Sequence, residues 1–104
     1  MEYVHADGEP DFDELCRIVG AIAAEYGIER VYLFGSRARG DNGPGSDYDF
    51  CIRTPDDMGL FKMSGFYRKL GDALGTSVDI VCEESLRDDF SKTISKDLRL
   101  IYEA

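Results

Sequence analysis

At 104 residues the chain has the length of one domain, and we expect a single domain over residues 1–104, with 43% hydrophobic and 32% charged residues as in soluble globular proteins. Its 21 acidic residues against 12 basic ones give a net charge of −9, which argues against binding to a nucleic-acid backbone, because that binding depends on Lys and Arg. The acidic balance favours a basic protein partner or bound cations, with a solvated acidic surface that keeps the protein soluble as an equal alternative.

The cysteines argue against two further classes of protein. Cys16, Cys51 and Cys82 are odd in number and widely spaced, with no Cys-x-x-Cys pair, so neither a disulfide framework nor a zinc site is indicated. Each is expected to be a small buried core residue. The sequence shows no signal peptide and no apolar run long enough to cross a bilayer, so we expect a cytoplasmic protein that does not act at a membrane.

The first predicted element is a helix over residues 11–26. Asp11 can cap its start, Glu14 stands at the capping-box position three residues later, and Gly27 suits the position just after the last turn. Apolar residues recur on one face at helical spacing: Leu15, Val19, Ile22, Ala23 and Tyr26. The helix therefore has a face that can pack against a core.

Two strands separated by a loop follow the helix. Residues 30–34 form an apolar run that ends abruptly at Gly35, which predicts a buried strand. Residues 40–46 hold three glycines and one proline, which predicts a loop. Residues 47–53 alternate as a strand does, with Tyr48, Phe50 and Ile52 on one side and Asp47, Asp49 and Cys51 on the other.

The second half of the chain is predicted as helix, strand and helix. A helix is expected over residues 57–74, ended by Gly75, although three glycines within this range weaken it and make a break possible. Residues 77–82 form a third strand, and residues 85–102 carry an apolar stripe that predicts a last helix. This order indicates a mixed α/β (α+β) fold with a small mixed sheet of three to four strands flanked by helices.

Three features carry candidate chemistry. Gly35-Ser36 directly follows a buried strand, where glycine permits a tight turn and the close approach of a phosphate, and the serine hydroxyl adds a donor. Asp47-x-Asp49 places two carboxylates on one face of a strand, where they repel each other unless a metal ion or an arginine neutralises them. Asp79 is a carboxylate within an apolar strand, and it joins the other two if the strands are neighbours.

Each feature also has a structural alternative. Gly35-Ser36 can be a simple turn, a solvated strand face can explain one aspartate, and Asp79 can pair with a neighbouring arginine. Together, three carboxylates form an all-oxygen site that suits Mg²⁺ better than zinc. Two such ions, roughly 3.5–4 Å apart, stabilise the attacking and leaving oxygens of an in-line displacement, while the turn would hold a triphosphate.

Two motifs together resemble the signature of the DNA polymerase β-like nucleotidyltransferase superfamily, and most of all its minimal nucleotidyltransferase branch: LFGSRARG at residues 33–40 and SDYDF at residues 46–50. The family pattern is a Gly-Ser turn, a spacer, an Asp-x-Asp strand and a third acidic residue on a later strand. Here Gly35 lies twelve positions before Asp47, and Asp79 supplies the third acidic residue. The resemblance runs from about residue 28 to residue 102 and implies a nucleotidyltransferase fold.

The resemblance also implies residue roles. Asp47 and Asp49 would bind both Mg²⁺ ions, and Asp79 would bind the catalytic ion and help to activate the acceptor. The nucleotide site of the bound ATP would be formed by residues that follow the first strand: Gly35, Ser36 and, as a candidate phosphate contact, Arg39. For Arg37, a surface position is an equal alternative.

The function implied by the resemblance is transfer of AMP from ATP to a hydroxyl of a partner protein. That partner would be a small helical HEPN-type toxin, and this chain would be its antitoxin; the acidic composition suits a basic, RNA-cleaving partner. A different class of function is a non-catalytic binding module that neutralises the partner by stoichiometric contact, and a homodimer or a hetero-oligomer is compatible with so small a domain. A nucleotidyltransferase for small molecules, such as an aminoglycoside, ranks lower, because those relatives generally carry more chain to hold the acceptor.

Overall fold

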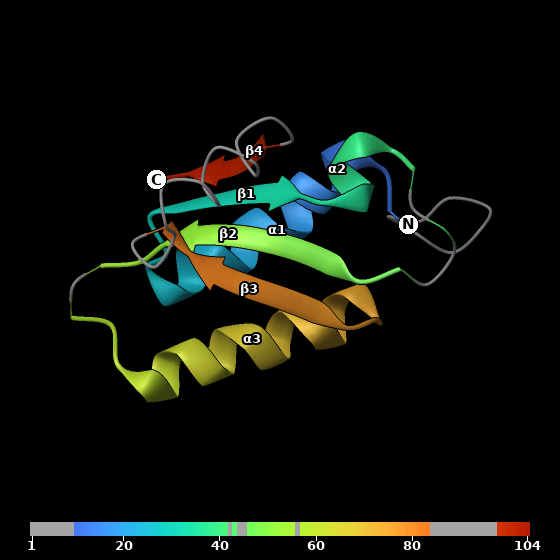
Figure 1. The fold of residues 1–104 in the computed structure, drawn as a ribbon. Coiled ribbons are helices and arrows are strands. Elements are labelled where there is room, and N and C mark those ends of the chain that lie inside the picture. Colours follow the sequence, from blue (N-terminus) through green and yellow to red (C-terminus); the bar gives the residue numbers. More distant parts are fainter. Residues whose placement is uncertain (1–9, 42, 44–45, 56, 84–97) are drawn as a thin grey trace.

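A four-stranded sheet is the centre of this computed structural model, which describes residues 10–41, 43, 46–55, 57–83 and 98–104 (Figure 1). The strands are β1 (Arg30–Phe34), β2 (Tyr48–Arg53), β3 (Val78–Cys82) and β4 (Arg99–Glu103), in the spatial order β3-β2-β1-β4. β1 is antiparallel to β2 and to β4, whereas β2 and β3 are parallel. The predicted mixed α/β fold with a small mixed sheet is therefore confirmed.

Two long helices, α1 (Phe12–Tyr26) and α3 (Leu60–Leu74), lie side by side along the sheet, and a short helix, α2 (Ser36–Arg39), follows β1 (Figure 1). The aromatic rings of Tyr26 and Phe66 join the two long helices with centroids 6.0 Å apart. The side chains buried between helices and sheet form one core, which includes Val19, Val31, Leu33, Phe50, Ile52, Phe66, Leu70 and Val78. No helix in the described part of the chain is long and apolar enough to cross a bilayer.

The start and end of α1 agree with the sequence prediction. The Glu14 N–H donates to Asp11 Oδ1 at 2.8 Å, and the Asp11 N–H donates to Glu14 Oε1 at 3.1 Å, which completes the capping box. Gly27 takes a left-handed conformation with φ of 73° and closes the helix. Side-chain hydrogen bonds thus fix the start of this helix, and the backbone conformation of a glycine fixes its end.

Helix α3 begins at Leu60, three residues later than predicted, and it runs without a break to Leu74. The possible break at its glycines does not occur. Close packing between the helices favours glycine at one of these positions, Gly65, because a Cβ atom there would lie 3.1 Å from Tyr26 Oη of α1. The glycine permits the two helices to approach closely, and the surrounding core compensates for its low helix propensity.

The last predicted helix, over residues 85–102, is wrong at its C-terminal end, because residues 99–103 form strand β4; residues 84–97 lie outside the described residues. Pairing with β1 satisfies backbone groups that would otherwise form an open sheet edge. Ile101 enters the core, and Tyr102 packs against Gly20 of α1. Ile and Tyr favour strands, so tertiary pairing overrides the helical spacing of the apolar residues.

None of the cysteines forms a disulfide. Cys51 is buried, as predicted for all three, whereas Cys16 and Cys82 are half-buried at the margin of the core.

Candidate active site

The parallel pair β2–β3 brings two of the predicted carboxylates together. Asp49 of β2 stands directly opposite Asp79 of β3 in the strand register, so both project from the same face of the sheet. Asp47 lies one residue before β2 and two residues before Asp49. The strands that carry Asp49 and Asp79 are neighbours, as the predicted grouping of the carboxylates requires.

The electrostatics of Asp49 shows that the three carboxylates affect one another. Burial raises the pKa of Asp49 above its ordinary value, and the negative charges of Asp79 and Asp47 raise this pKa further, whereas the positive charge of Arg39 opposes the shift. Asp49 is half-buried, while Asp47 and Asp79 are exposed to solvent. A cation placed among the three would relieve the repulsion.

Gly35 lies against Asp49 at the end of β1, where Phe34 is the register partner of Asp49. Its φ of 80° and ψ of −158° belong to a region that is nearly restricted to glycine. A Cβ atom at Gly35 would collide with Asp49 Oδ2 and lie 3.1 Å from Asp49 Cγ. Backbone conformation and lack of space both require glycine here, so the Gly-Ser turn and the carboxylates form one site.

The chain after the turn contains more structure than the sequence predicted. Ser36 is half-buried and begins the four-residue helix α2, and its carbonyl accepts the Gly40 N–H at 2.9 Å. Further along, the Ser46 N–H donates to the Gly43 carbonyl at 3.2 Å, and the Gly43 N–H donates to Ser46 Oγ at 3.0 Å. The predicted loop over residues 40–46 therefore ends in a local turn, with residues 42, 44 and 45 outside the described part of the chain.

The two arginines of the motif have different surroundings. Arg39 is exposed, its Nε donates to Asp41 Oδ2 at 3.1 Å, and its charge acts on Asp49. Arg37 is half-buried, and its Nε donates to the Ser46 carbonyl oxygen at 2.8 Å. This contact of Arg37 could not be predicted from the sequence, where only its position between Ser36 and Arg39 is visible.

The donor set suits Mg²⁺, although no three Asp, Glu, His or Cys side chains within the described ranges already converge on one point. Mg²⁺ usually binds through one or two carboxylates and completes its coordination with water and substrate phosphates. The opposed pair Asp49 and Asp79 supplies these carboxylates, with Asp47 close enough to act on Asp49. The roles of the three aspartates as metal ligands stay predictions.

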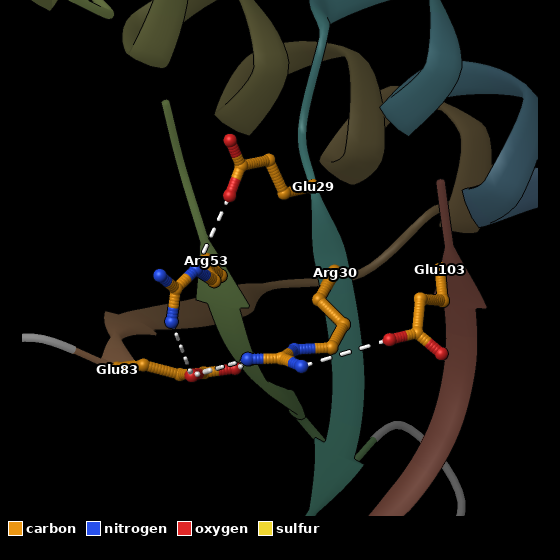
Figure 2. A network of polar contacts seen from close by, with 5 residues as sticks. All are labelled: Glu29, Arg30, Arg53, Glu83 and Glu103. Atoms are coloured by element: carbon orange, nitrogen blue, oxygen red, sulfur yellow. Dashed lines mark hydrogen bonds and ion pairs between the residues drawn. The ribbon is translucent and has the colours of Figure 1, made fainter. Parts of the chain in front are cut away.

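A second polar cluster, which the sequence did not indicate, lies at the other end of the strands (Figure 2). Arg30 of β1 donates to Glu83 through Nε at 3.2 Å and through a terminal nitrogen at 3.1 Å, and it lies 3.6 Å from Glu103 of β4. Arg53 of β2 lies 3.2 Å from Glu29 and 3.9 Å from Glu83. These charges pair with one another beside a cavity of about 470 Å³, so we assign the cluster a structural role.

Comparison with known proteins decides the family. A family model described as a nucleotidyltransferase domain matches residues 15–102. The chain belongs to this nucleotidyltransferase family. The nucleotidyltransferase is 29% identical over 73 residues to the protein adenylyltransferase MntA of Thermococcus cleftensis, a match that covers 70% of this chain and 74% of that relative.

Solved structures are similar as well. One, provisionally described as a minimal nucleotidyltransferase, has a TM-score of 0.74 and 28% identity, and the match covers 86% of this chain and 94% of the other. Another is a complex of a tri-AMPylated HEPN toxin of Shewanella oneidensis with its MNT antitoxin, with a TM-score of 0.65, 18% identity and coverage of 88% and 73%. The second likeness is one of fold alone. The predicted family and the enzyme class of nucleotidyltransferase are confirmed.

Proposed function

We propose that this nucleotidyltransferase transfers AMP from ATP to a hydroxyl of a partner protein, with Mg²⁺ at Asp47, Asp49 and Asp79. The observation that carries the proposal is the contact of the Gly35 turn with Asp49, which itself stands opposite Asp79. This contact joins a turn suited to phosphates with carboxylates suited to Mg²⁺. A relative named as a protein adenylyltransferase and a structural neighbour bound to an AMP-modified toxin support the same activity.

Different residues of the chain would bind the triphosphate and activate the acceptor. Gly35 leaves room for the triphosphate beside the main chain, Ser36 offers its hydroxyl as a donor, and Arg39 offers a positive charge to a phosphate. Mg²⁺, when bound, neutralises negative charge on the reacting phosphates. The acceptor oxygen forms a bond to the α-phosphorus, the bond to the bridging oxygen breaks, and pyrophosphate leaves. Asp79, exposed on β3, takes the proton of the acceptor hydroxyl.

The partner in this proposal is a small helical toxin of the HEPN type, with this chain as its antitoxin. Asp47 and Asp79 are exposed, so the carboxylates are open to a macromolecular acceptor. The net charge of −9 favours a basic partner over a nucleic acid. We place the protein in the cytoplasm, where the proposed AMP donor ATP is available, in a hetero-oligomer with the toxin.

A non-catalytic antitoxin that binds its partner stoichiometrically is the second candidate. It is favoured by the exposure of Asp47 and Asp79 and by the net charge of −9, which together offer an acidic surface to a basic partner. In this case the aspartates would contribute acidic surface only, and nucleotide would be unnecessary for neutralisation.

Intact-mass spectrometry of a HEPN toxin incubated with this protein, ATP and Mg²⁺ separates the two candidates. We expect the toxin to gain the mass of one or more AMP units with the natural chain, and no gain with Asp49→Asn. The matched control is Asp57→Asn, which alters an exposed aspartate beyond the C-terminal end of β2, the opposite end of that strand from Asp47 and Asp49, and should retain transfer. A toxin that is silenced in a stable complex without any gain in mass would contradict the enzymatic proposal and support stoichiometric binding.

A further inference from the structure

Arg37 connects the Gly-Ser turn to the first aspartate of the site. Its Nε donates to the carbonyl oxygen of Ser46 at 2.8 Å, and a terminal nitrogen donates to the same oxygen. Its guanidinium carbon lies 4.0 Å from the centroid of the Tyr48 ring, within the range of a cation–π contact. One side chain of α2 thus contacts the residue before Asp47 and the residue after it.

The groups that Arg37 contacts are themselves held firmly. Tyr48 is 3% exposed, and its ring stacks parallel to that of Phe50 with centroids 5.8 Å apart. The Tyr48 N–H donates to the Ser77 carbonyl at 3.1 Å, at the start of β3. The peptide groups on both sides of Asp47 therefore have fixed partners, one on α2 and one beside β3. The carboxylate of Asp47 is exposed, so its direction depends on this backbone.

We propose that Arg37 is a positioning residue, which holds Asp47 in the direction needed to share a cation with Asp49. The inference rests on the proposed metal site and extends it by one residue that touches neither metal nor nucleotide. Arg37 immediately follows Ser36, so its contacts with Ser46 and Tyr48 also fix the distance between the proposed triphosphate turn and the proposed metal-binding carboxylates.

The direction in which cation affinity changes on replacing Arg37 separates a positioning role from a purely electrostatic one. Removal of a positive charge near a cation site strengthens cation binding by Coulomb's law. Loss of a residue that orients a ligand weakens it, by roughly 10- to 100-fold in comparable metal sites. Arg37→Gln should therefore weaken cation binding, the reverse of what the change in charge alone would produce.

The test is a titration of the full-length protein with Mn²⁺, followed by electron paramagnetic resonance, in the presence of the non-hydrolysable analogue AMP-PNP. We expect Arg37→Gln to raise the dissociation constant of Mn²⁺ by roughly 10-fold or more. The Mn²⁺ dissociation constant of Arg37→Lys should lie between those of the natural chain and Arg37→Gln, because lysine retains a donor and the charge but loses the planar contact with Tyr48. Arg68→Gln on the exposed part of α3 is the matched control and should bind Mn²⁺ as the natural chain does. Circular dichroism checks that each variant is folded. If Arg37→Gln does not fold, the Mn²⁺ affinity of Arg37→Lys alone decides the test.

A double-mutant cycle with Asp47→Asn shows whether Arg37 acts through Asp47. If it does, Arg37→Gln should cause little further loss of Mn²⁺ affinity in the Asp47→Asn background. Equal losses in both backgrounds, unchanged or tighter Mn²⁺ binding in Arg37→Gln, or an Arg37→Lys variant identical to the natural chain would overturn the inference. A natural chain that binds no Mn²⁺ overturns the metal site and this inference together. A natural chain that binds Mn²⁺ but transfers no AMP contradicts only the proposed reaction.

Discussion

Gly35, between β1 and α2, has a backbone conformation that is nearly restricted to glycine, and a side chain there would meet Asp49. We expect Gly35→Ala to lower the free energy of unfolding by about 1–3 kcal/mol and to weaken binding of ATP. Urea denaturation and calorimetric titration with AMP-PNP and Mg²⁺ measure the two effects.

Gly71→Ala is the control for this prediction. Gly71 lies within α3 and has no positive φ, and a Cβ atom there would lie 3.8 Å from the Thr76 carbonyl oxygen, an ordinary contact distance. Because alanine favours a helix more than glycine does, the control should retain stability and nucleotide binding. Equal losses in the two variants would mean that the contact with Asp49 does not matter.

The raised pKa of Asp49 predicts how stability depends on pH in the absence of metal. The native state holds the Asp49 proton more tightly than the unfolded state does, so the natural chain loses stability as pH rises from the ordinary value of 3.8 through the raised pKa. Asp49→Asn lacks this loss and should be the more stable protein at pH 7. Urea denaturation across this pH range should show the difference vanish in acid; a difference that persists below pH 3.8 would contradict the assignment.

At the scale of single elements, local chemistry predicted some boundaries well and others poorly. The capping box and Gly27 fixed α1 correctly, and alternation identified β2 to within one residue. The start of α3 was missed because Gly59 caps it without a side-chain hydrogen bond. Strand β4 was missed because its pairing partner, β1, lies far away in the sequence. Spacing of apolar residues alone does not carry that information.

The cap of α1 supports a direct test of local stability. Asp11→Ala removes the acceptor for the Glu14 N–H and should lower the free energy of unfolding by about 1 kcal/mol. Asp13→Ala, in the first turn of the same helix but without a role in the cap, is the matched control and should have a smaller effect. Chemical denaturation of both variants measures the contrast. The prediction fails if Asp13→Ala costs as much as Asp11→Ala.

The candidate site shows the same division between local and distant information. The types and spacing of Gly35, Asp47 and Asp49 are visible in the sequence. The in-register pairing of Asp49 with Asp79 depends on strand order, and the contact of Arg37 with Ser46 depends on how α2, packed beside β1, places the Arg37 side chain next to Tyr48 of β2. Neither follows from residue spacing, so the sequence predicted the chemical groups of the site but not the contacts that orient them.

At the scale of the whole molecule, the cluster around Glu83 connects β1, β2 and β4 at one end of the sheet (Figure 2). Glu83→Gln removes the charge shared by Arg30 and Arg53 and should lower the thermal midpoint by a few degrees at low salt. High salt should reduce the difference. Glu25→Gln breaks an exposed ion pair with Lys69 and should have little effect, as isolated surface pairs do. Equal shifts for the two variants, measured by differential scanning calorimetry, would show that the cluster does not act as a network.

The place of β4 in the sheet also bears on how the molecule forms. Arg30 pairs with Glu103, 73 positions later, so β1 lacks one of its two neighbours until the ribosome has released that distant segment. Closing so long a loop costs entropy before any contact is gained, and contacts between distant residues slow folding. This edge of β1 therefore stays open from the synthesis of β1 until translation has passed β4, and the sheet of the described residues closes only then.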